Sequence, residues 1–235
     1  MRPTYILWVL STLLWISCKP VQYPLVATAQ ENNYLSPGAP IDSSTYFFIQ
    51  PYRQKLDSAM SLEIGFFAKD MVKDHGSGSL DLWIANSIYD FAKTIHPEVA
   101  VAIHNSGGIR LPVVESGPVL RSTIFELSPF DNNLVFVTLS GEELEQLIQH
   151  TIDQGGWPIS RQLSFEVEKG KLKNLRIRQV PVATPQTYIV ALQDYIANGG
   201  DDTFFLKDKT QEQTGILIRD ILLSAVPSTE GNNRE

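Results

Sequence analysis

The segment from His104 to Arg110 has the composition of an anion-binding turn. It reads His-Asn-Ser-Gly-Gly-Ile-Arg and directly follows an apolar run at 99–103, which predicts a buried strand. Glycines allow a tight turn and a close approach to a ligand, and the backbone N–H groups of such a turn form a concave donor site. The guanidinium of Arg110 adds a fork of donors suited to phosphate or carboxylate. Because short glycine motifs also arise by chance, an ordinary strand exit beside a solvated arginine is the alternative.

Two further loops carry residues suited to binding a small molecule. Ser-Pro-Phe-Asp-Asn at 128–132 contains Phe130, and a later loop contains Tyr195, Asn198 and Asp201. Two aromatic rings on neighbouring loops can clamp a flat heterocycle, since stacking contributes about 1–3 kcal/mol per base. Asp201 or Asn198 could form hydrogen bonds with sugar hydroxyls. The alternative for each ring is packing in the core, and for Asp201 it is capping of a turn.

The composition is that of a soluble globular protein without a basic surface. The 235 residues are 43% hydrophobic and 19% charged, with a net charge of −7, and this length allows one well-buried core. Nucleic-acid binding depends on neutralised phosphates, so we expect none here. The histidines are scattered, at His75, His96, His104 and His150, and no carboxylate cluster accompanies them. We therefore expect no metal or other cofactor on this chain and assign no catalytic residue.

The hydrophobic pattern predicts the elements that position these loops. Helical spacing of apolar residues predicts helices over 79–94, over 216–226 and from 43 to about 60, the last of which Pro51 should shorten or kink. Ser140 and Glu143 have capping-box spacing and should open another helix. Strands are expected at 62–68, 99–103, 134–139 and 188–192, a hairpin over 163–177, and a polar loop over 193–204. Because the helices and strands do not alternate regularly, we expect one α+β (mixed α/β) domain with a mixed sheet and flanking helices.

The N-terminus has the pattern of a bacterial lipoprotein signal. The apolar run at 5–16 is too short to span a bilayer, and Leu-Trp-Ile-Ser-Cys at 14–18 resembles a lipobox in which Trp15 replaces the usual leucine. Cys18 is the only cysteine, which excludes an intramolecular disulfide. We expect Cys18 to be lipidated and to anchor the protein in the bacterial cell envelope, at the periplasmic or surface face of the outer membrane. An ordinary signal peptide with an incidental cysteine is the alternative.

These patterns divide the chain into four segments. We predict a signal peptide with lipobox at 1–18, a proline-containing flexible tether at 19–42, a folded domain at 43–226 and a disordered tail at 227–235.

Taken together, the three loops resemble the C-terminal, substrate-binding domain of the 5'-nucleotidase family. The motifs Asn-Ser-Gly-Gly-Ile-Arg at 105–110, Ser-Pro-Phe-Asp-Asn at 128–132 and Ala-Asn-Gly-Gly-Asp at 197–201 occur in this order, and the resemblance covers about residues 45–226. It implies that the ligand is a nucleoside or a nucleoside 5'-phosphate.

The resemblance also assigns roles to individual side chains. It implies that Asn105 and Arg110 contact phosphate or nucleoside, that Phe130 and Tyr195 enclose the base, and that Asp201 holds the ribose hydroxyls. Tyr195 stands where the family usually has phenylalanine, a change that keeps a stacking face. The predicted substrate-binding set is Asn105, Gly107, Gly108, Arg110, Phe130, Asn132, Tyr195, Asn198 and Asp201.

The sequence also departs from the family pattern. The N-terminal metallophosphoesterase domain, which carries the two-metal centre in the family, is absent, together with its ligand motifs. Leu80-Asp81-Leu82-Trp83 lies where a leucine-glycine-asparagine turn is usual, Asn86 replaces an aspartate, and residues 75–78 lack a phosphate-binding arginine. Phosphate affinity should therefore be weaker than in intact relatives.

Three functions follow from this combination. The first is a lipid-anchored recognition subunit for nucleotide hydrolysis, with divalent metals held only by a separately encoded metallophosphoesterase. The second is a nucleoside- or nucleotide-binding lipoprotein without catalysis. The third is a degenerate membrane-anchored scaffold that binds another protein.

Overall fold

The computed structural model describes residues 42–228. Within helix α2 (Ser43–Met60), the boundary between two units of the chain falls between Tyr46 and Phe47. The predicted signal peptide, the lipobox with Cys18 and nearly all of the predicted tether lie outside the described residues, as do residues 229–235 of the predicted tail. Within the described part, no helix combines the length and the hydrophobicity that crossing a membrane requires.

Helix α2 (Ser43–Met60) begins where the sequence predicts, and the carboxylate of Asp42 accepts a 2.8 Å hydrogen bond from the Thr45 N–H in its first turn. The expectation that Pro51 shortens this helix is wrong, because the helix continues through it to Met60. No residue of α2 is buried. In so exposed a helix, water can satisfy the carbonyl that loses its partner to proline.

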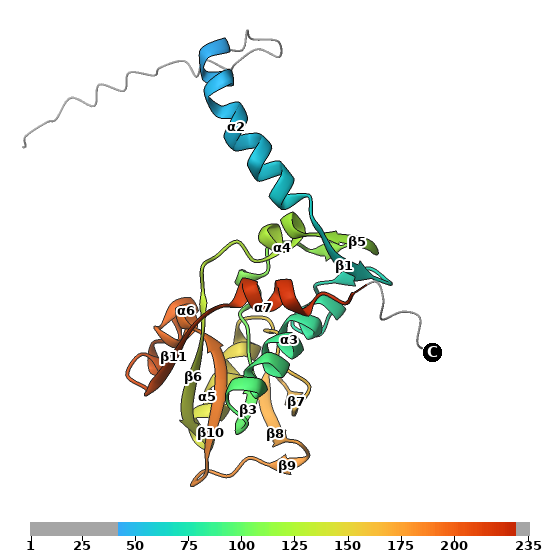
Figure 1. Ribbon diagram of the computed structural model, residues 1–235. Helices are drawn as coiled ribbons and strands as arrows, with labels where there is room; N and C mark the ends of the chain where they lie inside the picture. The colour runs from blue at the N-terminus through green and yellow to red at the C-terminus, as the bar shows by residue number, and fades with distance from the viewer. Residues whose placement is uncertain (1–41, 229–235) are drawn as a thin grey trace, which may run out of the picture. The chain divides into compact units, whose positions relative to one another are not determined.

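A four-stranded sheet forms the centre of the domain (Figure 1). Its order is β11 (Gln211–Leu217), β6 (Asn133–Ser140), β10 (Thr187–Gln193) and β3 (Val99–Ala102). Strands β3 and β10 are parallel, whereas β6 runs antiparallel to both β10 and β11. The sheet is therefore mixed, as expected for an α+β domain.

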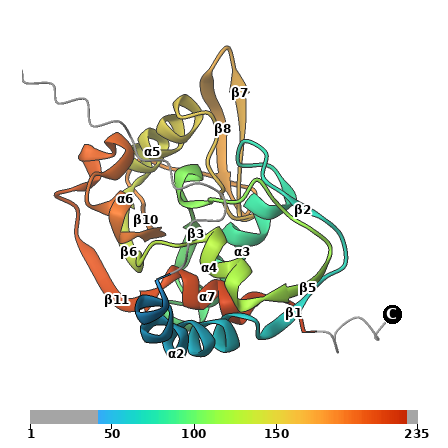
Figure 2. The ribbon, with the colours of Figure 1, turned by 90° about the horizontal axis from the view of Figure 1, so that it is seen from above.

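Side chains of the central strands alternate between two hydrophobic cores, one on each face of the sheet. Leu134 and Phe136 of β6 belong to one core, and Val135 and Val137 belong to the other. This alternation follows from the two-residue period of a strand. Helices α3 (Ser79–Ile95) and α7 (Ile218–Ala225) cover the first face, and α5 (Gly141–Asp153) covers the second (Figure 2).

The predicted capping box at the start of α5 is confirmed. The Ser140 Oγ accepts a 3.3 Å hydrogen bond from the Glu143 N–H, and the Ser140 N–H donates to a Glu143 carboxylate oxygen at 2.8 Å. The predicted hairpin is also confirmed, as β7 (Leu163–Glu168) and β8 (Lys171–Ile177), and β9 (Val180–Pro181) extends it.

Two boundary predictions are wrong. The predicted loop at 193–204 contains the short helix α6 (Asp194–Ala197), and residues 216–217 belong to β11 rather than to the last helix. The remaining strands are β1 (Glu63–Phe67), β2 (Met71–Val72), β4 (Val113–Val114) and β5 (Gly117–Leu120), and the remaining α-helix is α4 (Arg121–Leu127). Strand β1 pairs with β5, and β2 pairs with β4.

Candidate functional site

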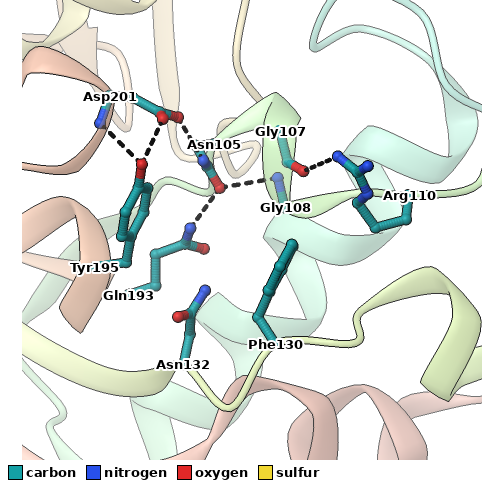
Figure 3. A pocket seen from close by; sticks show the side chains of 9 residues that line it. All are labelled: Asn105, Gly107, Gly108, Arg110, Phe130, Asn132, Gln193, Tyr195 and Asp201. Atoms are coloured by element: carbon teal, nitrogen blue, oxygen red, sulfur yellow. Dashed lines mark hydrogen bonds between the residues drawn. The ribbon is translucent and has the colours of Figure 1, made fainter. Parts of the chain in front are cut away.

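The three predicted loops meet at one edge of the central sheet. Parallel strands β3 and β10 both end there, and antiparallel β6 begins there, so the segments after β3 and β10 lie beside the segment before β6. They enclose a pocket of about 340 Å³ (Figure 3), a volume within the range of small-molecule sites. Its lining consists of Asn105, Gly107, Gly108, Arg110, Phe130, Asn132, Gln193, Tyr195 and Asp201.

The Asn105 side chain connects the turn after β3 to the end of β10 and to the loop that follows. Its Oδ1 accepts a 3.1 Å hydrogen bond from the Gly108 N–H and another from the Gln193 amide. Its Nδ2 donates to Asp201 Oδ2 at 2.5 Å. Asn105 is only 3% exposed, so these hydrogen bonds hold the three segments together beneath the pocket.

Two buried or partly buried groups support the glycine turn from below. The Lys73 ammonium donates to the carbonyls of Ser106 and Ile109 at 2.9 and 3.0 Å. His104 is buried and lies so close to Gly108 that an added Cβ would come within 2.5 Å of its ring. Burial lowers the pKa of His104 to about 4, so the ring is neutral near pH 7. Its role is structural, because it packs against the turn at Gly108.

Arg219 of α7 holds the loop that carries Phe130. Its guanidinium donates to the carbonyls of Ser128, Pro129 and Phe130 at 3.1–3.4 Å and pairs with the Asp131 carboxylate. The arginine is 8% exposed, whereas the Phe130 ring is 45% exposed and lines the pocket.

Tyr195 and Asp201 form the other side of the pocket, opposite Phe130 (Figure 3). The Tyr195 hydroxyl donates to Asp201 Oδ1 at 2.9 Å and lies 3.3 Å from the Asp201 N–H, which donates to it. The hydrogen bond to this carboxylate raises the pKa of Tyr195. The phenol is therefore protonated at neutral pH, and its one O–H group donates to Asp201.

Arg110 is the charged donor of the pocket. Its Nη1 donates weakly to the Gly107 carbonyl at 3.4 Å, and its guanidinium lies 6.0 Å from the Phe130 ring centre. Within residues 42–228 it forms no salt bridge, in contrast to Arg161, Lys209 and Arg219. Its charge therefore remains available to an anionic group in the pocket.

The structure brings together every predicted site residue except Asn198. The Asn198 side chain is exposed, lies outside the lining and accepts from Gln211 at 3.4 Å. Sequence reasoning missed Gln193, although a buried amide at the end of an apolar strand is a usable signal. It also missed Lys73 and Arg219, whose positions depend on long-range packing. In the described part of the chain, no group of three His, Cys, Asp or Glu side chains is arranged to hold a metal ion.

Comparison with known proteins shows which protein family this chain resembles. The family described as "5'-nucleotidase, C-terminal domain" matches residues 62–208. Protein UshA of Escherichia coli (strain K12) is 31% identical over 126 residues, which is 52% of this chain and 23% of that protein. A human 5'-nucleotidase is 26% identical over 208 residues, covering 74% of this chain and 36% of that protein.

The fold comparison agrees with the sequence comparison. The crystal structure of a 5'-nucleotidase precursor from Thermus thermophilus matches with a TM-score of 0.68 at 23% identity, over 80% of this chain and 41% of that one. The chain therefore belongs to the family of 5'-nucleotidase C-terminal domains. It spans less than half the length of each of these relatives.

Proposed function

We propose that the pocket binds a nucleoside or a nucleoside 5'-phosphate. The observation that carries the proposal is the combination of two half-exposed rings, a carboxylate and a guanidinium around one pocket. The rings of Phe130 and Tyr195 offer stacking surfaces to a base. Asp201 retains unused lone pairs for sugar hydroxyls, and Arg110 lies beside Phe130, where it can bind a phosphate.

The test is calorimetric titration of the purified protein with adenosine and with AMP. Phe130→Ala should weaken the binding of both about tenfold, because one stacking surface is lost. Tyr52→Ala is the matched control, since Tyr52 is an exposed aromatic residue of α2 outside the pocket lining, and it should leave both affinities unchanged. Absence of binding by the unsubstituted protein would disprove the proposal.

The binding domain serves, in this proposal, as the recognition part of a nucleotide hydrolase whose metal centre lies on another chain. Relatives that bear the name 5'-nucleotidase are longer than this chain, and hydrolysis of phosphate monoesters needs large transition-state stabilisation, such as a two-metal site supplies. In the described residues the pocket side chains bind and orient; none is arranged to activate water with a metal.

A reconstitution experiment tests this second step. A metallophosphoesterase from the same genome is assayed for AMP hydrolysis alone, with this protein, and with its Phe130→Ala variant. We expect stimulation by the unsubstituted protein and less by the variant. If the rate never exceeds that of the catalytic chain alone while adenosine still binds, the protein is a nucleotide-binding module without a catalytic partner.

We further propose that Cys18 is lipidated and anchors the domain in the bacterial cell envelope. The support is the position of the sole cysteine directly after the apolar run at 5–16. In a bacterial host, Cys18→Ala should abolish incorporation of labelled palmitate and move the protein out of the membrane fraction. Equal labelling of both proteins would contradict the proposal.

A further inference from the structure

The Tyr195 hydroxyl does more than complete an aromatic surface. It forms two hydrogen bonds with Asp201: it donates to one carboxylate oxygen at 2.9 Å and accepts from the backbone N–H at 3.3 Å. A phenylalanine would offer the same stacking face without either hydrogen bond. The hydroxyl therefore has a role that stacking does not account for.

Asp201 needs such support because its backbone is in the left-handed region, with φ of 48° and ψ of 41°. This conformation is unfavourable for residues other than glycine, although aspartate tolerates it better than most. Each of its polar groups has a partner: Tyr195 binds Oδ1 and the N–H, Asn105 binds Oδ2, and the ring of His150 lies 2.8 Å from the carbonyl.

The position of the Tyr195 ring is fixed as well. A Cβ on Gly200 would lie 2.5 Å from the Cε1 and Cζ atoms of the ring, so the ring passes directly over a residue that must lack a side chain. The hydroxyl cannot easily move away from Asp201 while the ring stays in this place. One side chain thus presents a face to the pocket and holds the carboxylate beside it.

We propose that Tyr195 is a positioning residue that sets the sugar specificity of the pocket by fixing the Asp201 carboxylate toward ligand hydroxyls. This inference rests on the proposed nucleoside-binding function. Asn105 and Tyr195 each use one lone pair on a different carboxylate oxygen, and each oxygen retains a second. A ligand with neighbouring hydroxyls can bind there, and a ligand without them cannot use the site.

The test compares adenosine with 2',3'-dideoxyadenosine by calorimetry in the unsubstituted protein and in Tyr195→Phe. Tyr195→Phe should weaken adenosine binding about tenfold, because a charge-assisted hydrogen bond to an ordered carboxylate is lost, and should leave dideoxyadenosine binding within about twofold. Equal changes for the two ligands, or no change for either, would overturn the proposal.

Two further variants separate positioning from a general structural effect. In an Asp201→Asn background, Tyr195→Phe should no longer alter the ratio of the two affinities, because the residue acts through the carboxylate. Tyr188→Phe removes another tyrosine hydroxyl, one that accepts from the Ala183 N–H and lies outside the pocket lining. It should leave the ratio unchanged.

A measurement without ligand distinguishes failure of this inference from failure of the proposed function. Hydrogen exchange of the Asp201 amide, followed by NMR, should accelerate at least about tenfold in Tyr195→Phe, because its acceptor is removed. If adenosine does not bind the unsubstituted protein, the nucleoside function fails, and unchanged exchange refutes the positioning role separately.

Discussion

At the scale of single residues, one amide connects the groups that a ligand would touch. Asn105 binds Gly108, Gln193 and Asp201 at once. Because these hydrogen bonds share a side chain, loss of Asn105 should disturb the turn and the carboxylate together. Substitutions at these positions will therefore not be additive.

Arg110 is expected to contribute to phosphate binding and not to base binding. Arg110→Gln keeps a polar side chain but removes the charge, so the affinity for AMP should fall about tenfold, the magnitude of a lost charge-assisted hydrogen bond. Adenosine affinity should stay the same. Titration of both ligands at low and high salt checks this, since the AMP preference should also decrease with ionic strength. A parallel loss for adenosine would show that Arg110 supports the pocket rather than the phosphate.

Buried His104 makes the stability of the domain depend on pH. Its folded pKa of about 4 lies below the ordinary value of 6.5, so the unfolded chain takes up a proton first as the pH falls. The contribution of buried His104 to the free energy of unfolding is therefore complete above pH 6.5, and it is lost as the pH falls from 6.5 to 4. The free energy of unfolding should fall by about 1 kcal/mol between pH 7.5 and 5.5.

Urea unfolding at several pH values measures this dependence. In His104→Gln the slope above pH 5 should largely disappear, whatever the stability of that variant at pH 7.5. A slope that is equal in both proteins would assign the effect to other groups. The carboxylates with lowered pKa values, Asp42, Asp70 and Glu143, lose their contribution to stability at lower pH, below their ordinary pKa values of about 4.

At the scale of elements, α7 organises the pocket although it contributes no lining residue. Arg219 donates hydrogen bonds to three carbonyls of the Phe130 loop and forms an ion pair with one of its carboxylates. Arg219→Lys keeps the charge but not the planar fork, so it should lower the free energy of unfolding by about 2 kcal/mol and weaken adenosine binding. Denaturation and titration test this. Arg161→Lys is the control, because its pair with Asp90 is exposed and should contribute less than about 1 kcal/mol.

The glycine turn offers a second test, in which two adjacent glycines should behave differently. A Cβ on Gly108 would meet the His104 ring at 2.5 Å, whereas a Cβ on Gly107 would meet nothing closer than 3.4 Å. Gly108→Ala should therefore lower the free energy of unfolding by about 1–3 kcal/mol. Gly107→Ala should change it by less than half of that. Equal effects in thermal denaturation would show that backbone entropy, not the contact with His104, governs both.

The elements differ in how far their sequences predict them. Ser140 and Glu143 form the predicted capping box because that interaction spans three residues. The hydrophobic pattern does not predict strand β11, because its polar residues Gln211, Glu212 and Gln213 pair with β6 through the backbone and leave no apolar alternation to detect. The sequence motifs predict nearly all of the residues that line the pocket. They do not predict Arg219 and Gln193, because these side chains bind residues 88–91 positions away in the sequence, and local patterns carry no information about such distant contacts.

At the scale of the whole domain, two cores share one sheet. Strands β3, β6 and β10 supply side chains to both, so neither core can be lost without removing support from the other. Ile84→Ala in one core and Leu147→Ala in the other should each cost about 2–5 kcal/mol. Both variants should still unfold in one transition, with the same midpoint by near- and far-ultraviolet circular dichroism. Separate midpoints would show that the cores are independent.

The order in which the pocket's parts occur along the chain has a consequence during synthesis. Asn105 and Asp201 bond across the pocket, but 96 positions separate them. The ribosome therefore synthesises the glycine turn that contains Asn105 long before it synthesises Asp201, whose carboxylate completes the site. The pocket cannot close until β10 and its following loop have been made, so a truncated or half-folded product would have the turn and no partner for it. Arg219, which holds the Phe130 loop, comes later still, so ligand binding would mark chains whose synthesis has passed α7.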